Sequence, residues 1–75
     1  MEVVVGNKYK HFKGHIYEVI AVARHCEDLS YQVVYRNVDD KESIWVRSLE
    51  EFTSKVDKEK YPNVTQEDRF ELIND

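Results

Sequence analysis

The chain has 75 residues, a formal net charge of −4 and an aromatic content of 12%, so we expect one domain with one small core. A single cysteine, Cys26, excludes an intramolecular disulfide and is typical of a reducing cytoplasm. No signal peptide is visible in MEVVVGNKYK, and the longest uncharged apolar run, VIAVA at 19–23, is too short to span a bilayer. We therefore expect a soluble cytoplasmic protein that makes no membrane contact.

The charges are spread unevenly along the chain. Residues 1–36 carry five Lys/Arg and four Asp/Glu, a balance of +1, whereas residues 37–75 carry six and eleven, a balance of −5. Long-range attraction to nucleic acid is therefore not expected of the whole molecule. A local cationic face built from the N-terminal half remains open.

Two strands are predicted near the N-terminus. KYKHF at 8–12 is short and aromatic, and HIYEVIAVARH at 15–25 is rich in Val, Ile and Ala without a capping signal. The apolar run 19–23 lies on both faces of the second strand, as expected where a strand bends across a barrel core.

A tight turn is predicted between these strands at FKGH, because Gly14 supplies the positive φ that such a turn needs. With Lys13 and Gly14 as a two-residue loop, Phe12 pairs with His15. His11 then falls on the face opposite His15, so the two imidazoles do not bind one ion. A bulge at Gly14 would shift this register by one residue.

Two further strands are predicted at 30–38 and 43–47. SYQVVYRNV alternates between two faces, and SIWVR places Trp45 and Arg47 on one face. If the loop at 37–42 closes a simple hairpin, the two strands lie side by side.

A helical turn is predicted after these strands. SLEE at 48–51 matches a capping box, with Ser48 as N-cap and Glu51 at the third helical position. Leu49 and Phe52 lie three residues apart, on one face of the turn.

The C-terminal third is predicted to be a loop followed by a closing strand. Residues 55–66 are polar and include Pro62, and DRFELI at 68–73 alternates. A C-terminal helix starting at Thr65 is the alternative. Four or five short strands with one helical turn predict an all-β fold, a small antiparallel SH3-like barrel forming a single monomeric domain over residues 1–75.

Several motifs also resemble a known family. They follow in order as YKHFKG, YEV, ARHCE, VVYR, WVR, F at 52 and RFE at 69–71. This pattern is similar to the bacterial "domain of unknown function 1653" family, and the resemblance covers residues 9–71. It implies an SH3-type barrel and no defined activity. The chain departs from the family pattern at Lys10 (usually Arg), Cys26 (usually Ser) and Ser48 (usually Pro).

Metal binding and nucleophilic catalysis are the sharper functional alternatives. His11, His15, His25 and Cys26 are soft-ligand types, but the chain has no C-x-x-C or H-x-x-H spacing. His25 and Cys26 are the two residue types that form a thiol–imidazole pair. Adjacent residues of a strand, however, point to opposite faces. We therefore expect no metal, no cofactor and no enzyme activity, with a small enzyme or metal site at His25 and Cys26 as the alternative.

A polar and aromatic recognition surface is the favoured hypothesis. The candidate residues are Tyr9, His11, Arg24, Tyr35, Trp45 and Arg47. Rings beside guanidinium groups suit stacked bases, peptide motifs or anionic groups. The sequence thus favours a non-catalytic binding module for nucleic acid or a peptide.

Structural roles for the same residues are the other alternative. The two tyrosines can be core residues with a polar tip in water, and Trp45 can cover a barrel opening. Arg36 and Arg47 can pair with acidic residues such as Asp39, Asp40 and Glu42, with little gain in stability. The chain would then be a structural accessory domain without a ligand.

Overall fold

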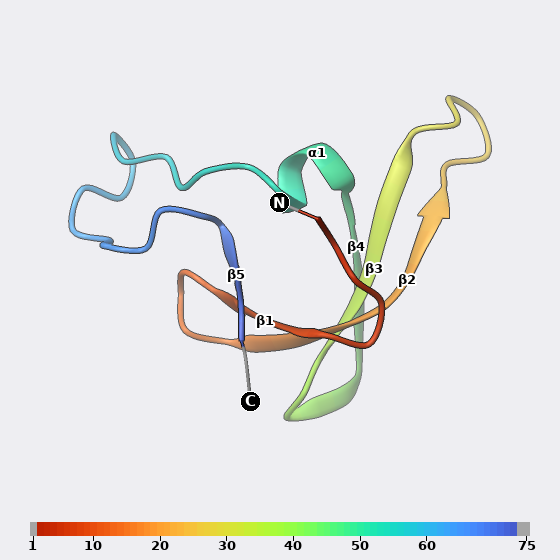
Figure 1. The fold of residues 1–75 in the computed structure, drawn as a ribbon, viewed down its shortest axis with the longest axis horizontal. Helices are drawn as coiled ribbons and strands as arrows, with labels where there is room; N and C mark the ends of the chain where they lie inside the picture. The colour runs from red at the N-terminus through yellow and green to blue at the C-terminus, as the bar shows by residue number, and fades with distance from the viewer. Residues whose placement is uncertain (1, 74–75) are drawn as a thin grey trace.

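The computed structural model describes residues 2–73, which form five antiparallel strands and one short helix (Figure 1). In chain order these are β1 (Lys8–His11), β2 (Ile16–Arg24), β3 (Tyr31–Asn37), β4 (Asp40–Ser48), α1 (Leu49–Phe52) and β5 (Phe70–Leu72). The sheet order is β4-β3-β2-β1-β5. This confirms the predicted all-β fold with one helical turn. The predicted domain also includes Met1, Asn74 and Asp75, which lie outside the described residues.

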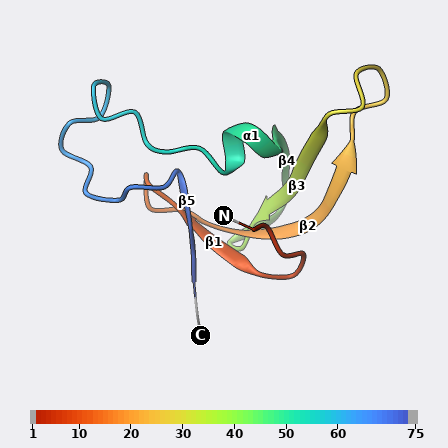
Figure 2. The ribbon, with the colours of Figure 1, turned by 45° about the horizontal axis from the view of Figure 1, so that its top comes forward.

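Strand β2 joins the two halves of the sheet. It pairs with β1 along its first residues and with β3 along most of its length. A register shift between Val19 and Ala21 interrupts the second pairing, and a bulge of this kind bends its strand. Figure 2 shows β2 curving from β1 toward the β3–β4 arm. The sheet curls into a barrel-like shape but stays open, because β4 and β5 are its two edges.

The core is largely aromatic. It contains Tyr9, Val19, Val33, Tyr35, Phe52 and Phe70, each at most 5% exposed. The rings of Phe52 and Phe70 stack with their centroids 4.0 Å apart, and Tyr9 meets Phe52 edge-on at 5.5 Å. Helix α1 thereby places a ring between the two halves of the sheet. Buried rings supply much of the burial that a chain this short needs.

Helix α1 begins with the predicted cap. The backbone N–H of Glu51 donates to Ser48 Oγ at 3.2 Å. The Glu51 carboxylate accepts from Arg47 Nη1, also at 3.2 Å, and so links the helix to β4. No helix within residues 2–73 is long and apolar enough to cross a membrane.

The segment between α1 and β5 is an extended loop, as Figure 1 shows. Contacts within the segment stabilise it. Lys58 Nζ donates to two carbonyl oxygens of this segment, at 2.6 and 3.0 Å. Lys55 and Asp68 form an isolated bridge, and their side chains pair at 2.9 Å. The closing strand is therefore confirmed, although it is shorter than predicted. The alternative prediction of a helix starting at Thr65 is wrong, because the backbone there forms this bridge and β5.

The β1–β2 turn differs from the prediction by one residue. The loop is Phe12–Gly14, and the His11 and His15 backbones pair across it at 2.8 Å. Gly14 has the expected positive φ, 103°, and its N–H donates to the carbonyl of His11 at 2.8 Å. A turn followed by a positive-φ glycine makes a three-residue loop, so the two-residue loop and its register were wrong.

The β3–β4 connection is also tighter than predicted. Strand β3 ends at Asn37 and β4 begins at Asp40, so only two residues turn the chain instead of the loop 37–42. The Asn37 side chain stabilises this turn by accepting from the backbone N–H of Asp39 at 2.8 Å. The longer β4 keeps Trp45 and Arg47 on one face, as predicted.

Candidate functional site

The shifted turn places His11 and His15 on the same face. Directly opposed residues of an antiparallel pair share a face, and the observed register pairs Tyr9 with Tyr17 and continues to the two histidines. The rings of both histidines lie close to Tyr17, with centroids 6.5 and 6.4 Å away. The bulge at Gly14 therefore gathers two imidazoles and a phenol on the inner side of the sheet.

Strands β3 and β4 contribute the opposite wall. Tyr35 pairs directly with Trp45, and Arg47 follows two residues later on the same face. Tyr35 is buried at 5% exposure, whereas Trp45 is 54% exposed. Arg47 Nε donates to the Tyr35 hydroxyl at 3.4 Å, so the guanidinium and the indole lie along one face of β4.

These walls enclose a concavity of about 250 Å³, which we call the aromatic groove. Its rings are His11, His15, Tyr17, Tyr35, Trp45 and Phe70, and its cations are Lys13 and Arg47. Tyr35 meets Tyr17 and Phe70 edge-on, at 5.1 and 5.5 Å between centroids. The groove thus presents ring surfaces with positive charge at its border.

A second concavity, which we call the cationic hollow, shares His11, Lys13 and Arg47 with the groove. It also has a volume of about 250 Å³ and lies between the β1–β2 turn and the segment that leads to β5. Its cations are Lys13, Arg47, Lys60 and Arg69, and its rings are Phe12 and Tyr61. Asp57 is the one acidic residue that lines it.

The imidazole of His11 lies at the junction of the two concavities. The pKa of His11 is lowered from 6.5 to about 4, mainly because burial disfavours the charged ring. The neighbouring cations Arg47, Arg69 and Lys13 add to this shift. The Nδ1 atom accepts from the backbone N–H of Lys13 at 3.1 Å, so the neutral ring carries its proton on Nε2. At pH 7 His11 is therefore an uncharged hydrogen-bond donor.

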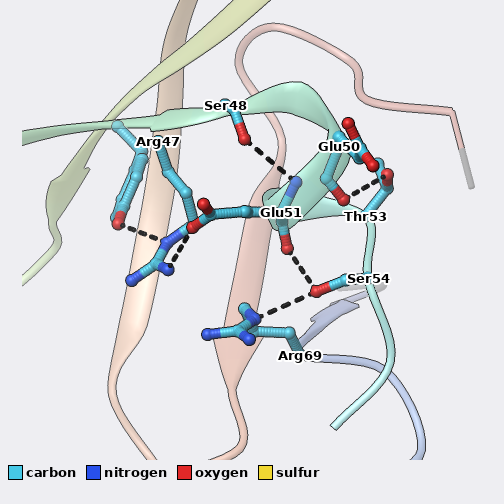
Figure 3. Close-up of polar contacts among 8 residues, drawn as sticks. Arg47, Ser48, Glu50, Glu51, Thr53, Ser54 and Arg69 are labelled. Carbon is cyan, nitrogen blue, oxygen red and sulfur yellow. Dashed lines mark hydrogen bonds and ion pairs between the residues drawn. The ribbon is translucent and has the colours of Figure 1, made fainter.

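Helix α1 orients the two arginines of the hollow. The Glu51 carboxylate accepts from Arg47, and the Glu51 carbonyl accepts from the Ser54 hydroxyl at 2.6 Å. Ser54 Oγ in turn accepts from Arg69 Nε at 3.1 Å. Figure 3 shows both guanidinium groups on the same side of the helix, pointing away from it. Glu51 of the helix and Ser54 just after it thus each hold one of the two arginines.

The structure brings together four of the six predicted site residues, His11, Tyr35, Trp45 and Arg47. Tyr9 is excluded because it is fully buried in the core, where its hydroxyl accepts from the Val4 backbone at 3.1 Å. Arg24 is excluded because it lies at the far end of β2, where it stacks on Tyr31. Tyr9 and Arg24 therefore do not share one face with the other four candidates.

The residues that the sequence interpretation missed are Lys13, His15, Tyr17 and Phe70 in the groove, and Lys60 and Arg69 in the hollow. A three-residue loop ending at Gly14 would have identified His15 and Tyr17. The acidic partners also differ from the expected ones. Arg36 pairs with Glu18 at 2.7 Å, and Arg47 pairs with Glu51.

The alternative site at His25 and Cys26 lies in the exposed β2–β3 loop. The Nδ1 atom of His25 accepts from the backbone N–H of Glu27 at 3.2 Å and lies 3.6 Å from Asp28. Neither residue lines the groove or the hollow. Within the described part of the chain, no three His, Cys, Asp or Glu side chains are grouped so that they could hold a metal ion.

The fold and the site together define a small, partly open SH3-like barrel with an aromatic groove and an adjoining cationic hollow. Residues 7–72 match the family model described as "Protein of unknown function (DUF1653)". The chain belongs to this family, as its motifs indicated. A search of the curated proteins and a search of the solved structures each found no match.

Proposed function

We propose that the chain is a non-catalytic binding module whose aromatic groove holds a single-stranded nucleic acid. The observation that supports this proposal is the gathering of six rings and two cations in one concavity of about 250 Å³. Aromatic faces stack with unpaired bases, and bordering cations pair with the backbone. The groove therefore carries both kinds of contact that single strands use.

The charge distribution favours a short single strand over a duplex or a long polyanion. The net charge of −4 repels an extended nucleic acid, whereas Lys13 and Arg47 attract it locally at the groove. The volume of the groove is smaller than that of sites that bind a whole drug-sized molecule. A peptide is the competing ligand, because aromatic grooves also bind extended peptides.

The single tryptophan offers a direct assay for this proposal. Trp45 is the only tryptophan in the chain, it lines the groove and it is 54% exposed. Stacking of a base on the indole should change its fluorescence. We expect short single-stranded oligonucleotides to quench this fluorescence in a saturable way, and matched duplexes to quench it far less.

The matched control is Arg47→Gln against Arg24→Gln. Both variants remove one guanidinium that contacts a tyrosine, but only Arg47 lines the groove. Binding of a labelled single strand should be lost in Arg47→Gln and retained in Arg24→Gln. Saturable quenching by peptides alone, or equal losses in the two variants, would contradict the proposal.

A further inference from the structure

The cationic hollow concentrates positive charge in an acidic chain. The sequence holds 15 acidic and 11 basic residues, yet four basic residues and one acidic residue line this concavity. Among residues 2–73, Lys13, Lys60 and Arg69 have no carboxylate within 4.0 Å. Like charges that converge without counter-charges repel one another, and an anion bound between them removes this repulsion.

The one acidic residue of the hollow is already engaged. Asp57 Oδ1 accepts from the backbone N–H groups of Glu59 and Lys60, at 3.0 and 3.4 Å. The carboxylate therefore shapes the turn that presents Lys60.

The two arginines retain donors for a ligand. Arg47 uses Nε and Nη1 in its contacts with Tyr35 and Glu51, and Arg69 uses Nε in its contact with Ser54. In the described chain, Nη2 of Arg47 and both Nη atoms of Arg69 make no further side-chain hydrogen bond. Figure 3 shows the two guanidinium groups on one side of the helix, as required for shared recognition of one anion. Guanidinium groups recognise phosphate through paired N–H donors.

Two ammonium groups also line the hollow. Lys13 Nζ lies 5.6 Å and Lys60 Nζ lies 5.5 Å from the centre of the Tyr61 ring. Tyr61 in turn packs against Phe12 at 4.9 Å. These rings hold two flexible side chains near the arginines by cation–π contact.

We infer that the cationic hollow binds the terminal phosphate of a nucleic-acid strand whose end base lies in the aromatic groove. A phosphate monoester carries a charge near −2 and three acceptor oxygens, which matches several converging cations better than a single carboxylate does. The two concavities share His11, Lys13 and Arg47, so they suit a base and a phosphate of the same nucleotide. A strand end also brings less repulsion from the acidic surface than an internal segment does.

This inference rests on the proposed function, and the test separates the two. The probes are one short oligonucleotide in three forms, with a 5′-phosphate, with a 3′-phosphate and with hydroxyl groups at both ends. Inorganic phosphate is a fourth probe, and Trp45 fluorescence and calorimetry are the readouts. We expect one phosphorylated form to bind about tenfold more tightly than the hydroxyl form, because charge-assisted hydrogen bonds are added.

Variants of the hollow should remove this preference and leave base stacking in place. Arg69→Gln and Lys60→Gln should bring the affinity of the phosphorylated strand down to that of the hydroxyl form. Lys60 is exposed, so its variant tests the site even if Arg69→Gln folds poorly. Lys41→Gln is the matched control, because it removes an exposed charge on β4 outside both concavities.

The outcomes distinguish the two proposals. Equal binding of all three strand forms, unaffected by Lys60→Gln, overturns the phosphate site and supports the groove as a single-strand site. Inorganic phosphate that binds as tightly as the phosphorylated strand overturns the strand end as the source of the phosphate. If no oligonucleotide binds, both proposals are overturned.

Discussion

The molecule carries the same three residue types at two places, with different results. The aromatic groove contains His11, Tyr35 and Arg47, and the far end of the β2–β3 hairpin contains His25, Tyr31 and Arg24. At the hairpin the arginine contacts its tyrosine more closely, at 2.6 Å compared with 3.4 Å in the groove. Arg24, His25 and Tyr31 are all exposed, whereas His11, Tyr35 and Arg47 are buried or half-buried.

Residue types alone therefore do not make a site. Water screens the exposed arginine–tyrosine contact of the hairpin. In the groove the Arg47 side chain is 29% exposed and is fixed by Glu51, and neighbouring rings and cations face a shared concavity. The site arises from burial and from curvature of the sheet, which bring residues of all five strands together.

The largest expected effect is on the turn that creates the groove. Gly14 has φ 103° and open space around the position of a Cβ atom, so the penalty for Gly14→Val comes from the backbone alone. We expect a loss of about 2 kcal/mol, which exceeds the gain of under about 1 kcal/mol from a stiffer unfolded chain. Denaturant unfolding measures this change.

The hairpin provides the opposite control for the turn. Leu29 has φ 63° and is 59% exposed, so Leu29→Gly should relieve strain and leave stability equal or higher. If Gly14→Val unfolds at the same denaturant concentration as the wild type, the bulge at Gly14 is contradicted. The shared face of His11 and His15 is then contradicted as well, because it depends on this bulge.

The next effect concerns the arginine of the groove. Arg47→Gln removes the ion pair with Glu51, and we expect it to cost about 1 kcal/mol because the side chain is half-buried. Thermal melting measures this loss, and Arg24→Gln should melt like the wild type. A loss of several kcal/mol would make Arg47 a buried structural partner and would contradict its role in ligand recognition.

A smaller effect is expected from pH. The pKa of His11 falls from 6.5 in the unfolded chain to about 4 in the fold, so the unfolded chain binds more protons between these values. Stability is then fully present above pH 6.5 and decreases as the pH falls to about 4. Because water partly screens this half-buried ring, we expect a loss of under about 1 kcal/mol.

The pH effect is measured by denaturant unfolding at several pH values. His11→Gln should flatten the profile between pH 6.5 and 4. The groups facing His11 are Arg47 on β4, Arg69 before β5, Lys13 in the turn and His15 directly before β2. An identical slope in His11→Gln and the wild type would show that other groups determine the acid sensitivity.

The smallest expected effect is that of chelation. No group of three metal-binding side chains occurs within residues 2–73, so we expect thermal melts with and without a chelator to coincide. A drop of several degrees in the melting temperature on chelation would contradict this prediction and would indicate that the histidines bind a metal ion.

The sheet could be predicted from the sequence because its strands are rich in β-branched and aromatic residues, and the strand at 30–38 also alternates between two faces. The helix N-cap at Ser48 could also be predicted, since it depends on a local sequence pattern. The register at Gly14 could not be settled in this way, because two- and three-residue loops both suit a glycine, and one residue decides which face His15 occupies. Lys60 and Arg69 were missed because the segment before β5 has no periodicity that places it beside β1.

The pairing of β5 with β1 means that the site draws on both ends of the described chain. Tyr9 lies opposite Leu72 in this pairing, and His11 lies opposite Phe70. Contacts between residues so far apart in sequence slow folding, because the entropy of closing a long loop opposes them. The aromatic groove is therefore complete only when the strand that carries Phe70 has paired with β1.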